Sequence, residues 1–274
     1  MRHSITSRFR GTLLGATLEE KISHQVQSPP IAELLTLGMQ SLVELGCFEY
    51  RSWLEKLLMA KLTPLQAIIA TLPLALFYHD NKIKLSANLL SVASIWSSEI
   101  IIRESILALG YAIAQALTEK LVPHKLISQI VEFVGAPNTD LVDKLIQVQN
   151  LLEQKAGLET TIIQLAPNSS SVTASIAFAL YCFLSTPEDI SLSIKRSRRS
   201  PGASSAIVGA LSGAYNGVYS IPSSWRISVD LQTSAQIEML QLSDSLVAVW
   251  SGVYDSKTKP LSTAVAAPRV IRSR

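Results

Sequence analysis

The densest group of chemically capable side chains is a basic cluster in the last third of the chain. It consists of Lys195, Arg196, Arg198 and Arg199 with the neighbouring Ser200, in the run KRSRRSP. Arginine presents a planar fork of donors that suits phosphate, and the N-terminus of a helix also attracts anions. A helix is predicted to begin directly after the cluster, so one interpretation is a contact site for a phosphate-bearing ligand or an acidic partner. The other interpretation is a solvated loop that binds nothing, and the sequence leaves both open.

Other residues that could do chemistry are isolated. His79 and Asp80 form a pair at the end of an apolar segment. No third catalytic partner can be identified for them, so a polar loop is the favoured interpretation. Asp140 and Asp143 fall in the first turn of a predicted helix, where carboxylates favour the helix dipole. This structural role is preferred to metal binding for both.

The helix that must position the basic cluster is predicted over residues 203–217. Small residues recur along it every four positions: Gly209, Gly213 and Gly217 in one row, and Ala206, Ala210 and Ala214 in the next. Positions four apart stack on one helix face, and each interior glycine costs up to about 1 kcal/mol relative to alanine. Close approach by another helix backbone explains this cost better than a membrane dimerisation face does. Pro222 is expected to end the helix, with Trp225 packed over its end.

Apolar residues at helical spacing predict further helices along most of the chain. They are expected over residues 7–20, 31–46, 48–60, 63–77, two within 81–120, 126–134, 139–154, 172–184, one from residue 187, and one within 227–254. Residues 157–172 are predicted to be irregular, and a short strand is considered only at residues 226–231. The first helix carries Gly11 and Gly15, which permit close packing. The pattern predicts one all-α domain over residues 1–254 and a basic, flexible tail over residues 255–274.

Composition excludes several classes of protein. Of 274 residues, 48% are hydrophobic and 16% are charged, which favours a substantial core and argues against disorder. A net charge of +3 is too small to indicate nucleic-acid binding. Every apolar run is interrupted before the ~20 residues that a membrane span needs, and no signal peptide is evident. Cys47 and Cys182 have neither metal-binding nor redox spacing, which favours a reduced, cytoplasmic setting.

Both ends of the chain resemble the ADP-ribosylglycohydrolase family. The run GALSGAYNGVYSIPSSW is similar to the last conserved block of that family, and IAFALYCFLSTPEDISLSI resembles the segment before it. Near the N-terminus, RGTLLG at residues 10–15 matches the family's opening helix, and PLAL at residues 73–76 matches a later Pro-Leu-x-Leu segment. The resemblance implies a single-domain orthogonal bundle of helices. In active members it implies magnesium-dependent hydrolysis of a glycosidic bond to ADP-ribose.

The positions at which the family carries its magnesium ligands are altered. Glu19 and Glu20 stand where the family has a Gly-Asp pair, PPIA at residues 29–32 replaces Thr-Asp-Asp-Thr, and RSPGA at residues 199–203 replaces Gly-Asp-Thr-Asp-Thr. Magnesium requires several hard oxygen ligands, and Arg198 and Arg199 would repel a cation. We therefore expect no catalytic residue, no bound metal and no cofactor.

Three functions follow from these observations. The favoured one is a catalytically inactive ADP-ribosylglycohydrolase-like protein that acts as a binding, structural or regulatory partner. The J-type lens crystallins show that members of this family can take such roles. The second is a weakly active or metal-independent ADP-ribosyl hydrolase. The third is an unrelated helical scaffold that shares only the packing glycines. The partner in the favoured reading is an unidentified protein or a phosphate-bearing ligand.

Overall fold

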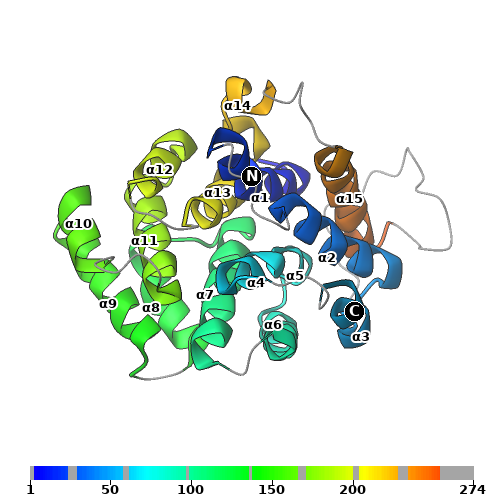
Figure 1. Cartoon of the computed structure of the whole chain (residues 1–274), viewed down its shortest axis with the longest axis horizontal. Helices are drawn as coiled ribbons and strands as arrows, with labels where there is room; N and C mark the ends of the chain where they lie inside the picture. Colours follow the sequence, from blue (N-terminus) through cyan, green and yellow to red (C-terminus); the bar gives the residue numbers. More distant parts are fainter. Residues whose placement is uncertain are drawn as a thin grey trace.

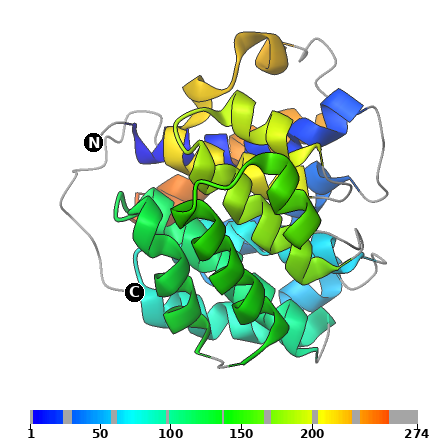
Figure 2. The same cartoon turned by 90° about the vertical axis from the view of Figure 1, so that its left-hand side faces the viewer.

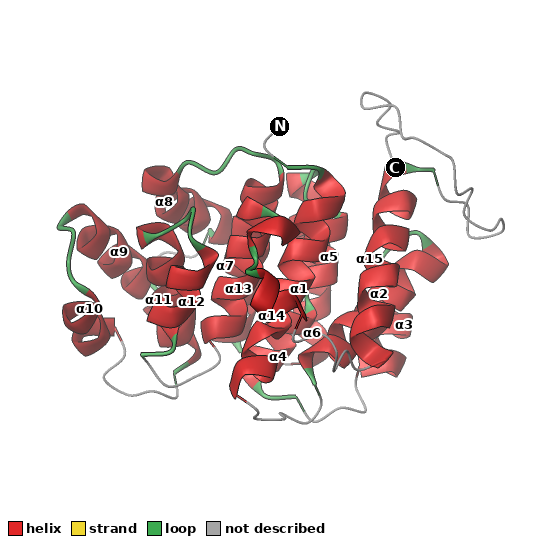
Figure 3. Ribbon diagram, turned by 90° about the horizontal axis from the view of Figure 1, so that it is seen from above, coloured by secondary structure: helices red, strands yellow, loops and turns green. Residues whose placement is uncertain are grey.

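The chain folds into α-helices joined by short connections (Figure 1, Figure 3). The computed structural model describes residues 3–23, 30–57, 62–96, 99–135, 138–165, 171–199, 204–227 and 234–253, and no strand occurs within them. The elements, in chain order, are α1 (Ile5–Ser23), α2 (Ile31–Leu45), α3 (Tyr50–Leu57), α4 (Pro64–Ala70), α5 (Leu72–Phe77), α6 (Lys82–Trp96), α7 (Ile100–Leu117), α8 (Pro123–Val134), α9 (Asp140–Glu153), α10 (Leu158–Leu165), α11 (Val172–Ser185), α12 (Ile190–Ser197), α13 (Ser204–Asn216), the short 3-10 helix η1 (Val218–Ser220), α14 (Ser223–Ile227) and α15 (Ser234–Ser251). The predicted all-α fold is therefore confirmed.

A single hydrophobic core runs through the described helices, from Phe9 in α1 to Val249 in α15. α7 lies within this core, and every residue from 104 to 114 is buried. Figure 2, viewed from the side of α9 and α10, shows α8 to α11 covering one face of the molecule. A core shared by the first and the last described helices is the signature of one domain.

α7 is also the described helix whose length and composition would allow it to cross a membrane. Within the described ranges it is the helix with the length and apolarity to cross a bilayer, with 18 residues and a mean hydropathy of 1.5. However, 78% of that stretch is buried inside the fold, as expected for a core helix. The described residues therefore present no clear membrane span.

The small-residue face of α13 packs against α1. A Cβ atom built on Gly11 would lie 2.5 Å from the carbonyl oxygen of Gly213, and one built on Gly209 would collide with the backbone of Gly15. These pairs show that the two helices run antiparallel, so the end of α1 lies beside the start of α13 (Figure 1). The backbones touch, and no side chain larger than hydrogen fits between them.

Gly217 packs against α1, as its spacing predicts, but it lies just past the helix. A Cβ atom built on Gly11 would lie 2.7 Å from the Gly217 carbonyl carbon, whereas α13 ends at Asn216 and Gly217 has a positive φ of 71°. Its N–H donates to the Gly213 carbonyl oxygen at 2.8 Å, the bond of a glycine that closes a helix. The prediction that Pro222 ends the helix is therefore wrong, since Pro222 directly precedes α14 instead.

Other predicted boundaries also shift for local reasons. The apolar segment 63–77 divides into α4 and α5 at Thr71, next to Pro73, which has no N–H to continue a helix. The helix predicted over residues 126–134 begins earlier, at Pro123, because proline favours the first position of a helix. The helix predicted from residue 187 begins at Ile190, and Asp189 caps it by accepting from the Leu192 N–H at 2.9 Å.

Two segments that the sequence predicts to be non-helical contain helical residues. The segment 157–172 was predicted to be irregular, which is wrong in part because it contains α10. The strand considered at residues 226–231 is contradicted at its start, where Arg226 belongs to α14. Ile227 also belongs to α14, whereas residues 228–231 and the predicted tail lie outside the described residues.

Candidate functional site

Two helix ends meet where the family resemblance predicts metal ligands. The antiparallel pairing of α1 and α13 brings the end of α1 to the start of α13. The third predicted position lies in the first turn of α2, which begins at Ile31. The side chains of Glu19 and Glu20 and residues 200–203 lie outside the described residues. The first turn of α2 and the start of α13 are therefore the described parts of this region.

The buried side chains described in this region are apolar or neutral. Ile31 and Ala32, at the positions of the family's acidic motif, are 2% and 3% exposed and belong to the hydrophobic core. Glu33 follows them but is exposed to solvent. On the opposite side, the Ser197 hydroxyl donates to the Ser205 hydroxyl at 2.8 Å, which ties α12 to the start of α13.

Methyl groups and paired hydroxyls do not fit a magnesium ion, which prefers near-octahedral carboxylate and water oxygens. Within the described ranges, no three His, Cys, Asp or Glu side chains come together in a way that could hold a metal. The first turn of α2 contributes to the core here rather than to a ligand shell. No chemical step through a metal is derived from this arrangement.

The basic cluster does not converge on the start of α13. Lys195 and Arg196 lie in the last turn of α12, and Arg198 is its C-cap, so these cations sit at the end of a helix whose dipole they favour. Arg199 forms an ion pair with Glu159 of α10 at 2.6 Å, with both side chains exposed. Ser200 lies outside the described residues. The cluster thus forms a basic edge at the end of α12, reaching to α10.

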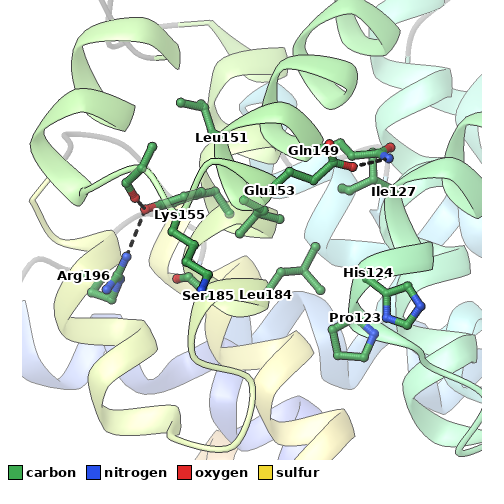
Figure 4. A pocket seen from close by; sticks show the side chains of 13 residues that line it. Pro123, His124, Ile127, Gln149, Leu151, Glu153, Lys155, Leu184, Ser185 and Arg196 are labelled. Carbon is green, nitrogen blue, oxygen red and sulfur yellow. Dashed lines mark hydrogen bonds between the residues drawn. The ribbon is translucent and has the colours of Figure 1, made fainter.

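Arg196 separates from the other basic residues and turns toward α11 (Figure 4). Its guanidinium lies 5.5 Å from the centre of the Tyr181 ring, and Nη2 donates to the Tyr181 hydroxyl at 3.2 Å. That hydroxyl donates in turn to the Ala156 carbonyl oxygen at 2.5 Å. Arg196 is therefore held in a fixed orientation at the wall of a cavity, and no local sequence pattern indicates the Tyr181 contact.

His79 has a structural environment rather than a catalytic one. Its ring packs between Phe9 and Trp250, with centroid distances of 5.7 and 4.8 Å. Burial lowers the pKa of His79, which favours the neutral ring. Nδ1 lies 2.7 Å from the Leu76 carbonyl oxygen, and because a carbonyl can only accept, Nδ1 carries the proton. Asp80 beside it is exposed.

The remaining candidates also have structural environments. Asp140 begins α9 and accepts a hydrogen bond from the Thr173 hydroxyl at 2.5 Å, which joins the starts of α9 and α11. Asp143 lies exposed in the same first turn. Burial raises the pKa of the Cys182 thiol to about 12, so this thiol is not a nucleophile at neutral pH. Cys47 is an exposed free thiol.

The fold is similar to a solved structure described as an ADP-ribosylglycohydrolase-related protein complex. The TM-score is 0.64 at 17% sequence identity, and the similarity covers 90% of this chain and 99% of that chain. No curated protein matches the sequence. At this identity the structural likeness demonstrates the fold alone.

The sequence itself matches the family model described as ADP-ribosylglycohydrolase over residues 48–256. The match includes the segment from α11 to α14, in which the conserved block was recognised. It spans most of the chain, from before α3 to beyond α15. The chain belongs to the ADP-ribosylglycohydrolase family.

Proposed function

We propose that this chain is a non-catalytic member of the ADP-ribosylglycohydrolase family that acts by binding, as a structural or regulatory partner of another protein. The observation that carries the proposal is the burial of Ile31 and Ala32 in the first turn of α2. An acidic motif at this turn would have to leave the hydrophobic core to reach a metal. The packing supports a turn that stabilises the fold and ligates nothing.

The scaffold beside that region is closely packed. α1 and α13 make a glycine-to-glycine contact that tolerates no side chain. A family member that has the helical framework but altered ligand positions is suited to bind a partner without hydrolysing a substrate. A weakly active or metal-independent hydrolase is the alternative, favoured by the remaining carboxylates of Glu19 and Glu20.

The partner contact in this proposal is the basic edge formed by Lys195, Arg198 and Arg199. All three side chains are exposed at the end of α12. Opposite charge on a partner would steer association, and exposed charges are screened over about 8–10 Å at physiological salt. The proposed partner surface is therefore acidic.

Turnover of an ADP-ribosylated protein tests the proposed loss of catalysis. The full chain is incubated with the substrate with and without magnesium, and free ADP-ribose is measured. We expect no release above the enzyme-free background under either condition. Magnesium-dependent release would refute the proposal, and release without magnesium would establish the alternative.

Binding of a fluorescent polyglutamate peptide tests the contact surface separately. We expect the affinity to fall as salt rises, and to fall further in the double variant Arg198→Ala with Arg199→Ala. Arg51→Ala serves as the matched control, because it removes an exposed arginine from α3, on the other side of the molecule (Figure 1). If neither salt nor the double variant changed the affinity, the basic edge would not be the contact surface.

A further inference from the structure

A cavity of about 480 Å³ opens between α8, α9, α11 and α12 (Figure 4). Cavities of this size accommodate small organic molecules. None of the residues that line it comes from α1, α2 or α13, which carry the predicted metal positions. The cavity is therefore separate from the region where the family resemblance places its ligands.

The cavity has an apolar floor. Ile127 of α8, Leu151 of α9 and Leu184 of α11 line it, and each is buried. Branched side chains of this kind offer dispersion contacts to a compact apolar body and no hydrogen bonds. A ligand that fills the cavity must therefore bring apolar surface to these three residues.

The rim carries two cationic groups on different elements. Arg196 of α12 lies at one side of the cavity in Figure 4, and Lys155 is contributed from the connection after α9. His124 of α8 lies at the other side. The Arg196 guanidinium is fixed by Tyr181, while its Nε is buried and has no hydrogen-bond partner. A buried donor without an acceptor is costly, and an anion in the cavity would supply one.

The acidic residue on the rim is already engaged. Glu153 Oε1 accepts a hydrogen bond from Gln149 Nε2 at 3.0 Å. Arg196 and Lys155 together carry two positive charges against the single negative charge of Glu153. The balance at the rim favours a negatively charged ligand group.

Lys155 holds its place at a conformational cost. It adopts a left-handed backbone conformation with φ of 50°, which is unfavourable for residues with a side chain. Its N–H donates to the Leu152 carbonyl oxygen at 3.1 Å, so it closes α9 at a position that glycine normally occupies. The chain thus places an ammonium group at the cavity where glycine would be more stable.

We propose that this cavity binds a small organic anion with a compact apolar body, the apolar part on Ile127, Leu151 and Leu184 and the anionic group held by Arg196 and Lys155. Phosphate and carboxylate groups share the required chemistry, since both accept several hydrogen bonds from an arginine fork. The inference goes beyond the proposed function, because it requires neither a protein partner nor the loss of hydrolysis.

Calorimetry on the full chain with three probes tests the proposal. Phenyl phosphate carries both the apolar body and the anion, inorganic phosphate carries only the anion, and benzyl alcohol carries only the apolar body. We expect phenyl phosphate to bind saturably and at least tenfold more tightly than either of the other probes. Absence of saturable phenyl phosphate binding, or equal binding of inorganic phosphate, would overturn the proposal.

Two variants locate the binding at the cavity. Arg196→Gln removes the fixed cation and is expected to weaken phenyl phosphate binding about tenfold. Lys155→Gly removes the ammonium and relieves the left-handed strain, so it should weaken binding several-fold while raising Tm by about 2 °C. Because the second variant stabilises the fold, lost binding cannot be attributed to unfolding.

Arg198→Gln is the matched control, since it removes an arginine two residues away that does not line the cavity. We expect it to bind phenyl phosphate like the unaltered protein. If both Arg196→Gln and Lys155→Gly bound phenyl phosphate as tightly as the unaltered protein does, the assignment to this cavity would be refuted. Weakening by Arg198→Gln alone would assign the anion to the basic edge instead.

Discussion

His79 shows how an ionisable residue can serve packing alone. Its ring joins α1, the end of α5 and α15 through Phe9, Leu76 and Trp250. Because burial lowers its pKa, the folded protein holds the ring neutral at pH values where the unfolded chain begins to protonate it. The residue therefore links the stability of the fold to pH.

The direction in which His79 makes stability depend on pH gives a prediction. Below the ordinary histidine pKa of about 6.5, the unfolded chain binds more protons at His79 than the folded protein, so the free energy of unfolding falls as pH falls. The His79→Asn variant loses ring packing and is less stable at every pH. However, its stability should fall less steeply between pH 7 and pH 5, as measured by urea denaturation. An equal slope in the variant and the unaltered protein would show that His79 does not contribute.

Glu104 is a buried acidic residue in the core of the fold. It lies in α7 with 1% exposure, and neither carboxylate oxygen has a hydrogen-bond partner. Burial of an unsatisfied polar group costs about 1–3 kcal/mol, and more for a charged group.

The Glu104→Met variant tests that cost. Methionine has similar length and no unmet hydrogen bond, so we expect the free energy of unfolding to rise by about 1–3 kcal/mol. Glu132→Met on α8 is the control, because Glu132 is exposed and its replacement should change stability by no more than about 0.5 kcal/mol. A destabilised Glu104→Met protein would indicate that the carboxylate makes a favourable interaction in solution.

At the scale of elements, the contact between α1 and α13 sets the geometry of the molecule. Gly213 lies against the backbone of Gly11, so any side chain at position 213 forces the two helices apart. Gly213→Leu should reduce the free energy of unfolding by about 3 kcal/mol, at the upper end of the usual cost of overpacking. Chemical denaturation of the purified variant measures this loss.

A milder variant and a control keep this prediction testable if Gly213→Leu does not fold. Gly213→Ala adds only the clashing Cβ and should still destabilise by about 1 kcal/mol or more. Gly157→Ala adds the same group where no atom lies within 4 Å and should be nearly neutral. Equal stability of the two alanine variants would contradict the close contact of α1 with α13.

The sequence predicted the helices well, because helical periodicity is a local property. It also indicated that α13 needs a close neighbour, yet it could not identify α1 as that neighbour, since pairing depends on contacts about 200 residues apart. Gly217 shows the limit of spacing: the same four-residue interval that places Gly209 and Gly213 on a face places Gly217 past the helix end. α10 was missed because its eight residues are too short to show a clear period.

The candidate sites were less predictable than the fold. Arg196 and Arg198 are two residues apart and look alike in the sequence, but one faces Tyr181 and the other is exposed at the end of α12. Lys155 and His124 carried no signal at all, because the cavity forms only when α8, α9, α11 and α12 assemble. Residues that act through tertiary contacts cannot be found from local patterns.

At the scale of the whole molecule, the sequence match and the fold both point to the same family. Neither of them implies that the chain binds magnesium. The chain has the family's helical fold, and the first turn of α2 packs Ile31 and Ala32 into the core. A fold supplies a framework, and function depends on the side chains placed upon it. We therefore propose, as the central claim, that this framework does not bind magnesium.

Isothermal titration of magnesium into the purified full chain tests this claim most directly. Chelator-treated protein is titrated at neutral pH and moderate salt, with calcium as a second divalent cation. The account predicts no heat of stoichiometric binding at magnesium concentrations in the low micromolar range. Tight binding of one or two magnesium ions per chain would contradict it.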